Sequence, residues 1–210
     1  ERPSSALLSW QMEYMELIGA NNESLAELNG EGVVVCVVDS GVDLGHPDLR
    51  GVELRGWRDS INGIEEPYDD EGHGTAMTGI IVSDGGLDGV AKGVDLLVAK
   101  AIDDEGLGTD GTVSDSVDWC VEQGADIISL SLGGSQSFGS DFFTTDELEQ
   151  SVNDALDSGV FVVSSAGNDG EDDDGDVGSP GSVEDVICVG GITRSGSIWS
   201  GSSEGDNDGR

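Results

Sequence analysis

Basic side chains are scarce in this chain of 210 residues. Lysine and arginine together number 8 against 44 aspartates and glutamates, so the formal net charge at pH 7 is -36, and the only lysines are Lys92 and Lys100. Nucleic-acid binding needs basic clusters that neutralise phosphates, and the composition argues against it. Self-repulsion of this size opposes compaction in dilute buffer and becomes tolerable when the Debye length falls to roughly 3 Å near 1 M salt. The composition therefore predicts a halophilic protein.

Long apolar runs are also missing. No stretch approaches the ~18 consecutive apolar residues of a membrane-spanning helix, so no membrane partner is expected. The first residues, Glu1-Arg2-Pro3-Ser4, are neither an initiator methionine nor a secretory signal, and we expect any targeting segment or propeptide to have been removed or to lie outside this sequence. No internal repeat or linker divides the chain, which predicts one domain over residues 1–210.

Cysteines are few, and the usual cofactor motifs are absent. Cys36, Cys120 and Cys188 are odd in number, lie in apolar contexts and share no metal-ligand spacing, so we expect buried free thiols rather than a disulfide framework. No G-x-G-x-x-G connects a strand to a helix, which argues against a dinucleotide cofactor. The acidic run at 171–176 lacks the closing glutamate of an EF-hand and is interpreted as solvated surface.

The most informative stretch begins with an unbroken apolar run from Val33 to Val38. It ends abruptly in Asp39-Ser40-Gly41. Short β-branched runs of this kind are typical of strands buried on both faces of a parallel sheet. In an open parallel sheet, ligands and chemistry gather beyond the carboxyl ends of the strands, where Asp39 would lie. An ordinary strand-ending turn is the alternative, because Asp, Ser and Gly are common turn residues.

Strands and helices alternate along the rest of the chain. We expect helices over residues 5–18, 73–81, 112–123 and from Thr144 or Thr145 to 159, and strands over residues 94–101, 126–132, 160–165 and 186–189. The segment between Leu49 and Tyr68 is expected to be irregular. This alternation predicts an α/β fold with a doubly wound, mostly parallel sheet flanked by helices.

A second polar group lies at the start of the expected helix over residues 73–81. Asp69-Asp70-Glu71-Gly72 gives way to His73, which would sit in the first helical turn. A single histidine in a loop is usually structural or solvated. The glycines on either side of His73 would allow close approach of a ligand or partner, which favours a functional role.

Five stretches, in this order, resemble the motifs of the subtilisin-like serine proteases, the subtilases. They are Val37-Val38-Asp39-Ser40-Gly41-Val42-Asp43, His46-Pro47-Asp48-Leu49, His73-Gly74-Thr75, Ser129-Leu130-Ser131-Leu132-Gly133-Gly134 and Ala166-Gly167-Asn168-Asp169. The resemblance, taken with the acidity, is to a haloarchaeal or halophilic type. It implies a secreted endopeptidase that acts as a monomer on polypeptide substrates and needs no cofactor for its chemistry.

The resemblance also implies roles for individual residues. Asp39 would orient the imidazole of His73, His73 would act as general base towards a serine, and the Asn168 side chain would donate to the oxyanion. We expect Asp39 and His73 within hydrogen-bond distance, and Asn168 facing the same cleft. The substrate backbone would pair as an added strand with two extended segments. The implied substrate-binding residues are Gly106, Leu107, Gly108, Ser131, Leu132, Gly133, Ala166 and Gly167.

One essential part of the family pattern is missing. The family's nucleophile lies in a Gly-Thr-Ser stretch beyond the oxyanion asparagine, and this sequence contains no Gly-Thr-Ser. Ser200-Gly201-Ser202-Ser203 resembles the surface stretch that precedes that region. The resemblance therefore implies the N-terminal two-thirds of a catalytic domain, with base, orienter and oxyanion donor but no nucleophile. The alternatives are a non-catalytic peptide-binding relative and an inactive truncated product.

Two further expectations follow from the resemblance. Asp48 matches a family calcium ligand, and Asp84 and Asp88 could coordinate a hard cation, although the loop over residues 82–90 is shorter than the family's calcium-binding version. Structural calcium is thus a possible cofactor. The peptide bond between Ser179 and Pro180 matches a turn that is cis in the family, and we expect it to be cis here.

Overall fold

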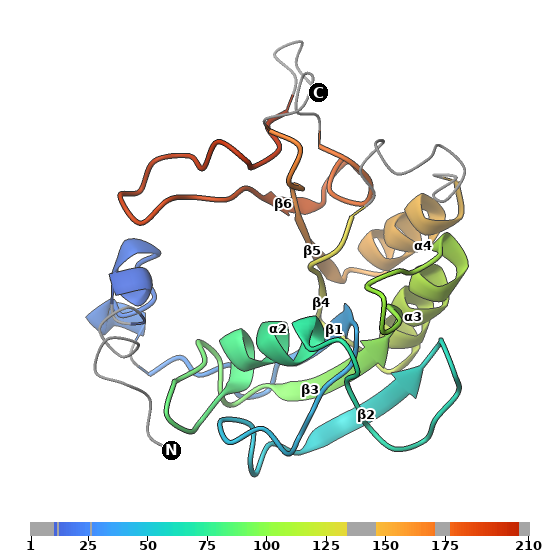
Figure 1. Cartoon of the computed structure of the whole chain (residues 1–210), viewed down its shortest axis with the longest axis horizontal. Helices are drawn as coiled ribbons and strands as arrows, with labels where there is room; N and C mark the ends of the chain where they lie inside the picture. The colour runs from blue at the N-terminus through green and yellow to red at the C-terminus, as the bar shows by residue number, and fades with distance from the viewer. Residues whose placement is uncertain (1–10, 12, 26, 134–145, 171–176, 206–210) are drawn as a thin grey trace.

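A parallel sheet organises the part of the chain that the structure describes. The computed structural model describes residues 11, 13–25, 27–133, 146–170 and 177–205. Six strands within these residues form one sheet in the order β2-β3-β1-β4-β5-β6, and every neighbouring pair is parallel (Figure 1). The strands are β1 (Val34–Asp39), β2 (Leu54–Asp59), β3 (Asp95–Lys100), β4 (Ile127–Leu130), β5 (Phe161–Ser165) and β6 (Ile187–Val189).

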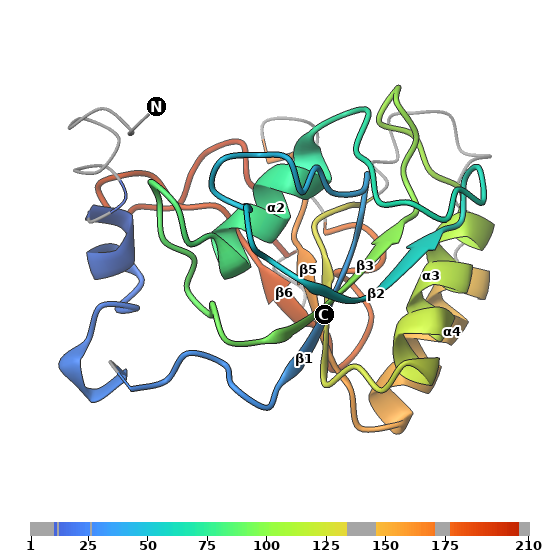
Figure 2. The ribbon, with the colours of Figure 1, turned by 90° about the horizontal axis from the view of Figure 1, so that it is seen from below.

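Helices cover both faces of this sheet. They are α2 (His73–Val82), α3 (Asp110–Glu122) and α4 (Asp146–Asp157), with a short 3-10 turn, η1 (Glu23–Leu25), near the N-terminus. Figure 2 shows α2 on one side of the sheet and α3 with α4 on the other. Val37 of β1 packs in the cluster under α2, whereas Cys36 and Val38 pack in the larger cluster under α3 and α4. The predicted doubly wound α/β architecture is therefore confirmed.

Most of the predicted elements are present, but one strand was missed. Residues 54–59 were expected to be irregular and instead form β2, the strand at one edge of the sheet. Its sequence, Leu54-Arg55-Gly56-Trp57-Arg58-Asp59, has no apolar run, because an edge strand keeps part of its surface exposed. Its pairing with β3 also contains a register shift between Leu54 and Gly56. Both features hide a strand from pattern analysis.

The N-terminal helix is described only in part. Residues 13–17 are helical, as predicted, and residues 5–10 of that prediction lie outside the described residues. The candidate helix caps Thr144 and Thr145 also lie outside them. No helix in the described ranges is both long enough and apolar enough to cross a membrane. The Ser179–Pro180 peptide bond is cis, as predicted.

The cysteine prediction was wrong. Cys36 and Cys120 form a disulfide, and Cys188 is free and exposed rather than buried. Cys36 points from β1 towards α3, and the packing of that helix brings the two Cα atoms to 5.9 Å, within the range that a disulfide can bridge. The two cysteines are 84 residues apart, so their pairing depends on tertiary packing that sequence spacing does not reveal. Cys188 is exposed because β6 is accessible along its whole length.

Candidate active site

The carboxyl ends of four neighbouring strands place the candidate residues along one edge of the sheet. Strands β3, β1, β4 and β5 are adjacent and parallel, so their last residues lie on the same side of the molecule. Asp39 is the last residue of β1, Ser131 follows β4, and Asn168 follows β5 by three residues. This edge is where an open parallel sheet binds ligands.

Asp39 and His73 are in direct contact. The His73 Nδ1 atom lies 2.8 Å from one carboxylate oxygen of Asp39 and 3.0 Å from the other. The Asp39 side chain is only 2% exposed, whereas 47% of the His73 side chain is exposed. The predicted hydrogen bond between these residues is thus present, and it anchors the buried side of a ring whose other side faces solvent.

The start of α2 fits closely against the end of β1. A Cβ atom on Gly74 would lie 2.3 Å from the carbonyl oxygen of Gly41, so only glycine allows this approach. The Gly74 N–H donates to the Ser40 hydroxyl, which in turn donates to Asp69. Asp69 also accepts hydrogen bonds from the N–H groups of Gly72 and Thr75. These contacts fix the turn from which His73 projects.

Burial and hydrogen bonding act in opposite directions on Asp39. Burial is the larger influence and raises the pKa of Asp39 above its ordinary value, while the hydrogen bonds from His73 and from the Ser40 N–H offset part of that rise. When the Asp39 carboxylate is ionised, it can only accept hydrogen bonds, so the proton of a neutral His73 ring belongs on Nδ1. The lone pair on Nε2 is then available to accept a proton, as a general base requires.

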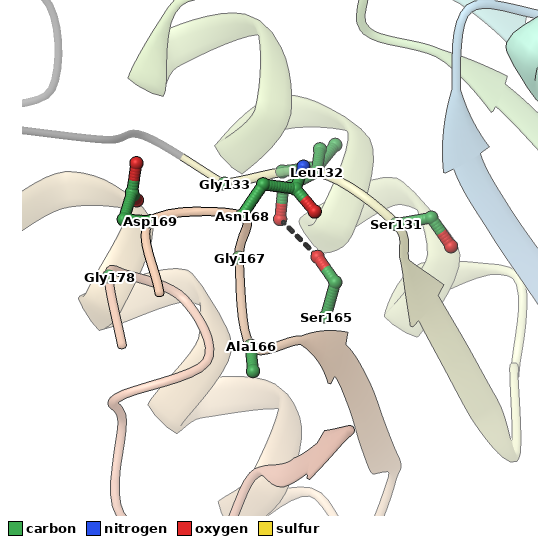
Figure 3. A pocket seen from close by; sticks show the side chains of 9 residues that line it. All are labelled: Ser131, Leu132, Gly133, Ser165, Ala166, Gly167, Asn168, Asp169 and Gly178. Atoms are coloured by element: carbon green, nitrogen blue, oxygen red, sulfur yellow. Dashed lines mark hydrogen bonds between the residues drawn. The ribbon is translucent and has the colours of Figure 1, made fainter. Parts of the chain in front are cut away.

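A cleft lies beside the ends of β4 and β5 (Figure 3). Its volume is about 290 Å³, and it is lined by Ser131, Leu132, Gly133, Ser165, Ala166, Gly167, Asn168, Asp169 and Gly178. Asn168 is exposed, and its side-chain amide makes no hydrogen bond to any other described residue. The amide is therefore free to donate to a ligand. A hydrogen bond of 3.4 Å from the Ser165 hydroxyl to the Leu132 carbonyl joins the two walls.

The structure brings together five of the eight predicted substrate-binding residues in this cleft: Ser131, Leu132, Gly133, Ala166 and Gly167. The other three, residues 106–108, follow β3 and are not part of the cleft wall. Asp103 holds their turn by accepting the N–H groups of Glu105 and Leu107. Leu107 is 49% exposed, and its N–H and carbonyl are both hydrogen-bonded to Asp103.

Helix α3 begins just after that segment with a buried acid, Asp110. The residue is 7% exposed, and neither carboxylate oxygen has a hydrogen-bond partner among the described residues. Burial raises the pKa of Asp110, and repulsion from Glu147 and Glu149 raises it further. The raised pKa means that the folded chain holds this proton more tightly than the unfolded chain does. The free energy of unfolding therefore falls as pH rises above the unfolded pKa of about 3.9, and it stays at the lower value at any pH above the pKa of Asp110 in the folded chain.

We therefore expect Asp110→Asn to stabilise the fold at pH 7 by about 1 kcal/mol, since it removes a charge that is buried without a partner. Urea unfolding at pH 7 and at pH 3.5 measures the effect, which should vanish at the lower pH. Asp115→Asn is the matched control, because Asp115 is exposed on the same helix. An equal increase in the free energy of unfolding for both variants would show that only the change in net charge matters.

The candidate calcium ligands do not form a metal shell. Among the described residues, no group of three or more His, Cys, Asp or Glu side chains is arranged to hold a metal ion. The Lys92 ammonium lies between Asp84 and Asp88, at 2.9 Å and 2.8 Å. Asp48 instead accepts the Gly86 N–H at 2.6 Å. Calcium binding stays a prediction, and Lys92 already provides a cation for two of its three candidate ligands.

Several residues around the site were not singled out from the sequence. Asp69 and Lys100 support the end of β1, and Ser165, Asp169 and Gly178 line the cleft. Asp69 lies four residues before His73, in the acidic stretch that was recognised only as a helix start. No pattern in the sequence marks Lys100, because a single lysine at a strand end is usually solvated.

The relationship to known proteins agrees with this geometry. The model of the subtilase family matches residues 30–210. The chain belongs to the subtilase family. It is 37% identical over 177 residues to the serine protease AprX of Bacillus subtilis, a match that covers 79% of this chain and 39% of that protein. It is 31% identical over 193 residues to subtilisin DY of Bacillus licheniformis, covering 90% of this chain and 67% of that protein.

A solved structure extends the relationship to the fold. The chain superposes on a cold-adapted subtilisin-like serine proteinase with a TM-score of 0.73 and 31% sequence identity, covering 86% of this chain and 62% of that one. Another relative, 35% identical and covered over 53% of its length, is the major intracellular serine protease of Bacillus subtilis. The subtilases similar to this chain thus include both intracellular enzymes and subtilisins, and the chain spans between two-fifths and two-thirds of their lengths.

Proposed function

We propose that Asp39, His73 and Asn168 belong to a serine endopeptidase active site, in which His73 is the general base, Asp39 orients it and Asn168 donates to the oxyanion. The observation that carries the proposal is the contact of buried Asp39 with the Nδ1 atom of half-exposed His73, at the sheet edge that also holds the free amide of Asn168. A peptide-binding module has no need of a histidine held in one tautomer by a buried acid. Membership of the subtilase family supports the same chemistry.

Each residue has a defined part in the proposed reaction. His73 Nε2 accepts the proton of a serine hydroxyl as that oxygen attacks the peptide carbonyl carbon, and it later gives the proton to the leaving amine. Asp39 keeps the proton of the neutral ring on Nδ1 and stabilises the imidazolium that forms. The Asn168 amide donates to the carbonyl oxygen as it becomes negative. Collapse of this intermediate breaks the C–N bond, releases the amine and leaves the acyl group on the serine oxygen. A water molecule, deprotonated by the same histidine, then hydrolyses that ester and restores the serine hydroxyl, so amide hydrolysis is divided into two easier steps.

The substrate class in this proposal is an extended polypeptide. Residues 131–133 and 106–108 each follow a strand at the same edge, β4 and β3, which are the neighbours of β1. A peptide backbone that pairs with these segments as an added strand would cross the sheet edge in front of Asp39 and His73. The exposed position of Leu107 and the open cleft at Leu132 support this placement.

We further propose that the nucleophilic serine is not among these 210 residues. No Gly-Thr-Ser occurs in the sequence. Ser202 and Ser203 are buried, and their hydroxyls accept the N–H groups of Gly191 and Asp169. A non-catalytic peptide-binding relative and an inactive product remain the alternative functions, since each could retain the cleft at Asn168 without hydrolysing peptides.

The environment in this proposal is extracellular and saline, and the protein acts as a monomer. The Cys36–Cys120 disulfide supports an oxidising compartment, because disulfides are rare in reducing cytosol. The net charge of -36 supports high salt, where screening reduces self-repulsion. One relative is named as an intracellular serine protease, so the location of this protein has to be tested separately from its chemistry.

A peptide hydrolysis assay across a salt series tests the proposed function. The 210-residue chain alone should show no enzyme-like turnover at any salt concentration, because removal of a triad member leaves only a residual ~10³–10⁴ over the very slow uncatalysed reaction. A longer product, that is, a polypeptide that contains these 210 residues followed by a segment with Gly-Thr-Ser, should hydrolyse the same peptides. Serine-directed inhibitors should block that hydrolysis. Robust hydrolysis by the 210-residue chain would show that it contains a nucleophile we have not identified.

A further inference from the structure

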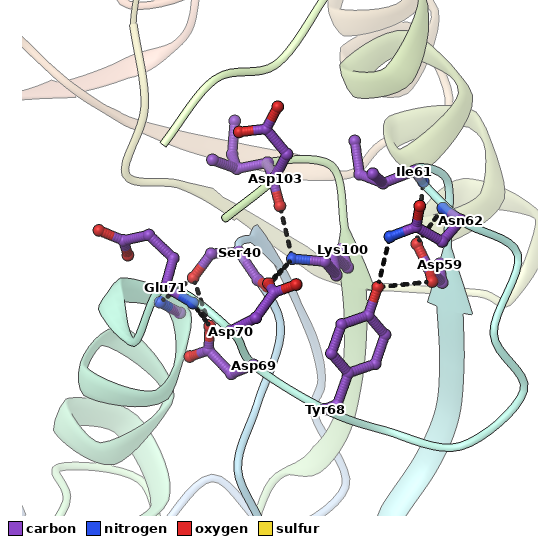
Figure 4. A network of polar contacts seen from close by, with 12 residues as sticks. Ser40, Asp59, Ile61, Asn62, Tyr68, Asp69, Asp70, Glu71, Lys100 and Asp103 are labelled. Atoms are coloured by element: carbon purple, nitrogen blue, oxygen red, sulfur yellow. Dashed lines mark hydrogen bonds and ion pairs between the residues drawn. The ribbon is translucent and has the colours of Figure 1, made fainter. Parts of the chain in front are cut away.

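Three consecutive acids, Asp69, Asp70 and Glu71, lead into α2 and hence to His73 (Figure 4). In a chain with 44 acidic residues, such a run is usually solvated surface. These three acids differ from one another, however, because the folded chain gives each carboxylate different partners. The partners show which of the three keeps a charge that a ligand can use.

Asp69 is engaged entirely within the protein. One carboxylate oxygen accepts the Ser40 hydroxyl at 2.9 Å and the Gly72 N–H at 2.8 Å, and the other accepts the N–H and the hydroxyl of Thr75 at 2.9 Å and 2.5 Å. Burial raises the pKa of Asp69, but these hydrogen bonds outweigh it and hold the pKa below its ordinary value. A carboxylate accepts about four hydrogen bonds, so Asp69 has no capacity left for a ligand.

Asp70 is paired with the buried ammonium of Lys100. The lysine is 0% exposed, and its Nζ atom donates to an Asp70 oxygen at 2.6 Å. The same nitrogen donates to the carbonyls of Ser40 and Ile102 at 2.7 Å and 2.8 Å and lies 5.0 Å from the centre of the Tyr68 ring. A buried charge requires such a complete set of partners. The charge of Asp70 is therefore balanced inside the protein.

Glu71 is the exception. It is exposed, and its Oε2 atom accepts the N–H of His73 at 2.7 Å. No described residue donates to its other oxygen, and none of the ion pairs among the described residues includes it. Figure 4 shows its side chain pointing away from Lys100. Glu71 therefore keeps an unpaired negative charge within one hydrogen bond of the residue that is the proposed general base.

The position of this carboxylate is fixed by the start of α2. The residue before the helix is Gly72, which has no side chain to accept the first N–H groups of α2. Glu71 supplies an acceptor in its place, and a negative charge at a helix N-terminus is favourable. A carboxylate that is already held in this way loses little freedom when it binds a cation. Capping uses one oxygen only and leaves the second open to solvent.

We propose that Glu71 is a specificity-determining residue, which selects Lys or Arg in the polypeptide substrate at the residue before the one whose carbonyl is attacked. This inference rests on the proposed function. Consecutive side chains of an extended peptide point to opposite sides. With the side chain of the attacked residue in the cleft at Asn168, the preceding side chain faces His73 and Glu71. An ammonium or guanidinium there donates to the open oxygen of Glu71.

Kinetics of a longer product measure this preference with short peptides that are identical except for Lys, norleucine or Glu at that one residue. An exposed ion pair and an exposed like-charge contact each change binding by up to about fivefold, so kcat/KM should be roughly tenfold higher for Lys than for Glu, with norleucine between them. Glu71→Gln should reduce this ratio to about twofold or less, and Glu71→Lys should reverse it. Added salt should lower the ratio, because salt screens exposed charges.

Two comparisons separate this role from simpler ones. The amide oxygen of Glu71→Gln can still accept the His73 N–H, so a role in helix capping alone would leave the ratio unchanged in that variant. Glu66→Gln is the matched control, because it removes the same charge at another exposed position of the segment before α2. An equal loss of preference in Glu66→Gln would assign the preference to the summed field of all the acids. Either of these results would overturn the inference.

Peptide binding to the 210-residue chain tests the inference without any need for activity. The backbone N–H signal of His73 in NMR spectra reports on the Glu71 carboxylate that accepts it. Titration of this signal should show about two- to fivefold tighter binding of the Lys peptide than of the norleucine peptide, and the difference should vanish in Glu71→Gln.

The two measurements distinguish the inference from the proposed function. An inactive longer product, together with the binding difference in the 210-residue chain, would count against the proposed function and support the charge preference of Glu71. An active product with no charge preference would leave the proposed function intact and overturn the inference. Absence of the preference from both measurements would overturn it as well.

Discussion

In dilute buffer the 210-residue chain is expected to lose its folded structure, and in molar salt it is expected to regain it. With 44 acidic residues against 8 basic ones, most carboxylates have no basic side chain to pair with. The Debye length is about 10 Å at 0.1 M salt and about 3 Å at 1 M, so only concentrated salt screens neighbouring carboxylates from one another. Self-repulsion of this size works against the compact state, and screening removes much of it.

Far-ultraviolet circular dichroism across a potassium chloride series measures this transition. Sucrose at matched osmolarity is the control, because it favours compaction by exclusion from the surface but screens no charge. Recovery of the fold in salt and not in sucrose supports electrostatic control. A spectrum that does not change from dilute buffer to molar salt would rule out the halophilic interpretation.

The second large effect is expected in peptidase kinetics of a longer product that contains a serine nucleophile. His73→Ala and Asp39→Asn should each lower kcat by about 10⁴-fold or more, and Asn168→Ala should lower it by about 10²–10³-fold. These magnitudes come from measurements on serine proteases, subtilisin among them, which belongs to the same family. The His73 and Asp39 losses should not add, because the two residues act as one unit.

His46→Ala is the control for these variants. His46 is exposed, and its side chain accepts only the Asp48 N–H among the described residues, so loss of the ring should leave kcat unchanged. An Asn168→Ala variant with full activity would assign the oxyanion contact to another group. Full activity in His73→Ala would contradict the catalytic role that the Asp39 contact supports.

Local patterns predicted the parts of the fold that are buried and continuous. The run from Val33 to Val38 corresponds to β1, and its abrupt polar end marks the edge at which Asp39 lies. Family motifs then identified His73 and Asn168, whose placement around one sheet edge no spacing rule could supply. Residues 54–59 were not predicted to form a strand, because an edge strand with two arginines and a register shift has no apolar run that a pattern could detect.

Features that depend on tertiary packing were beyond prediction. The Cys36–Cys120 bond exists because α3 crosses the face of β1 on which Cys36 lies. Lys100 follows the apolar run of β3 and could equally have been solvated at the strand end. Its burial depends on Tyr68 and Asp70 folding over it, and those residues lie in a segment without regular structure. Polar networks of this kind become visible only when the chain is folded.

Active-site labelling tests the central claim most directly. A fluorophosphonate probe reacts with a serine only when a base and an oxyanion site activate it, and mass spectrometry locates the modified residue. In molar salt, the 210-residue chain should carry no label, while a longer product with a Gly-Thr-Ser segment should carry one label at that serine, which His73→Ala abolishes. A label on any serine of the 210-residue chain, or one that persists without His73, would contradict the account.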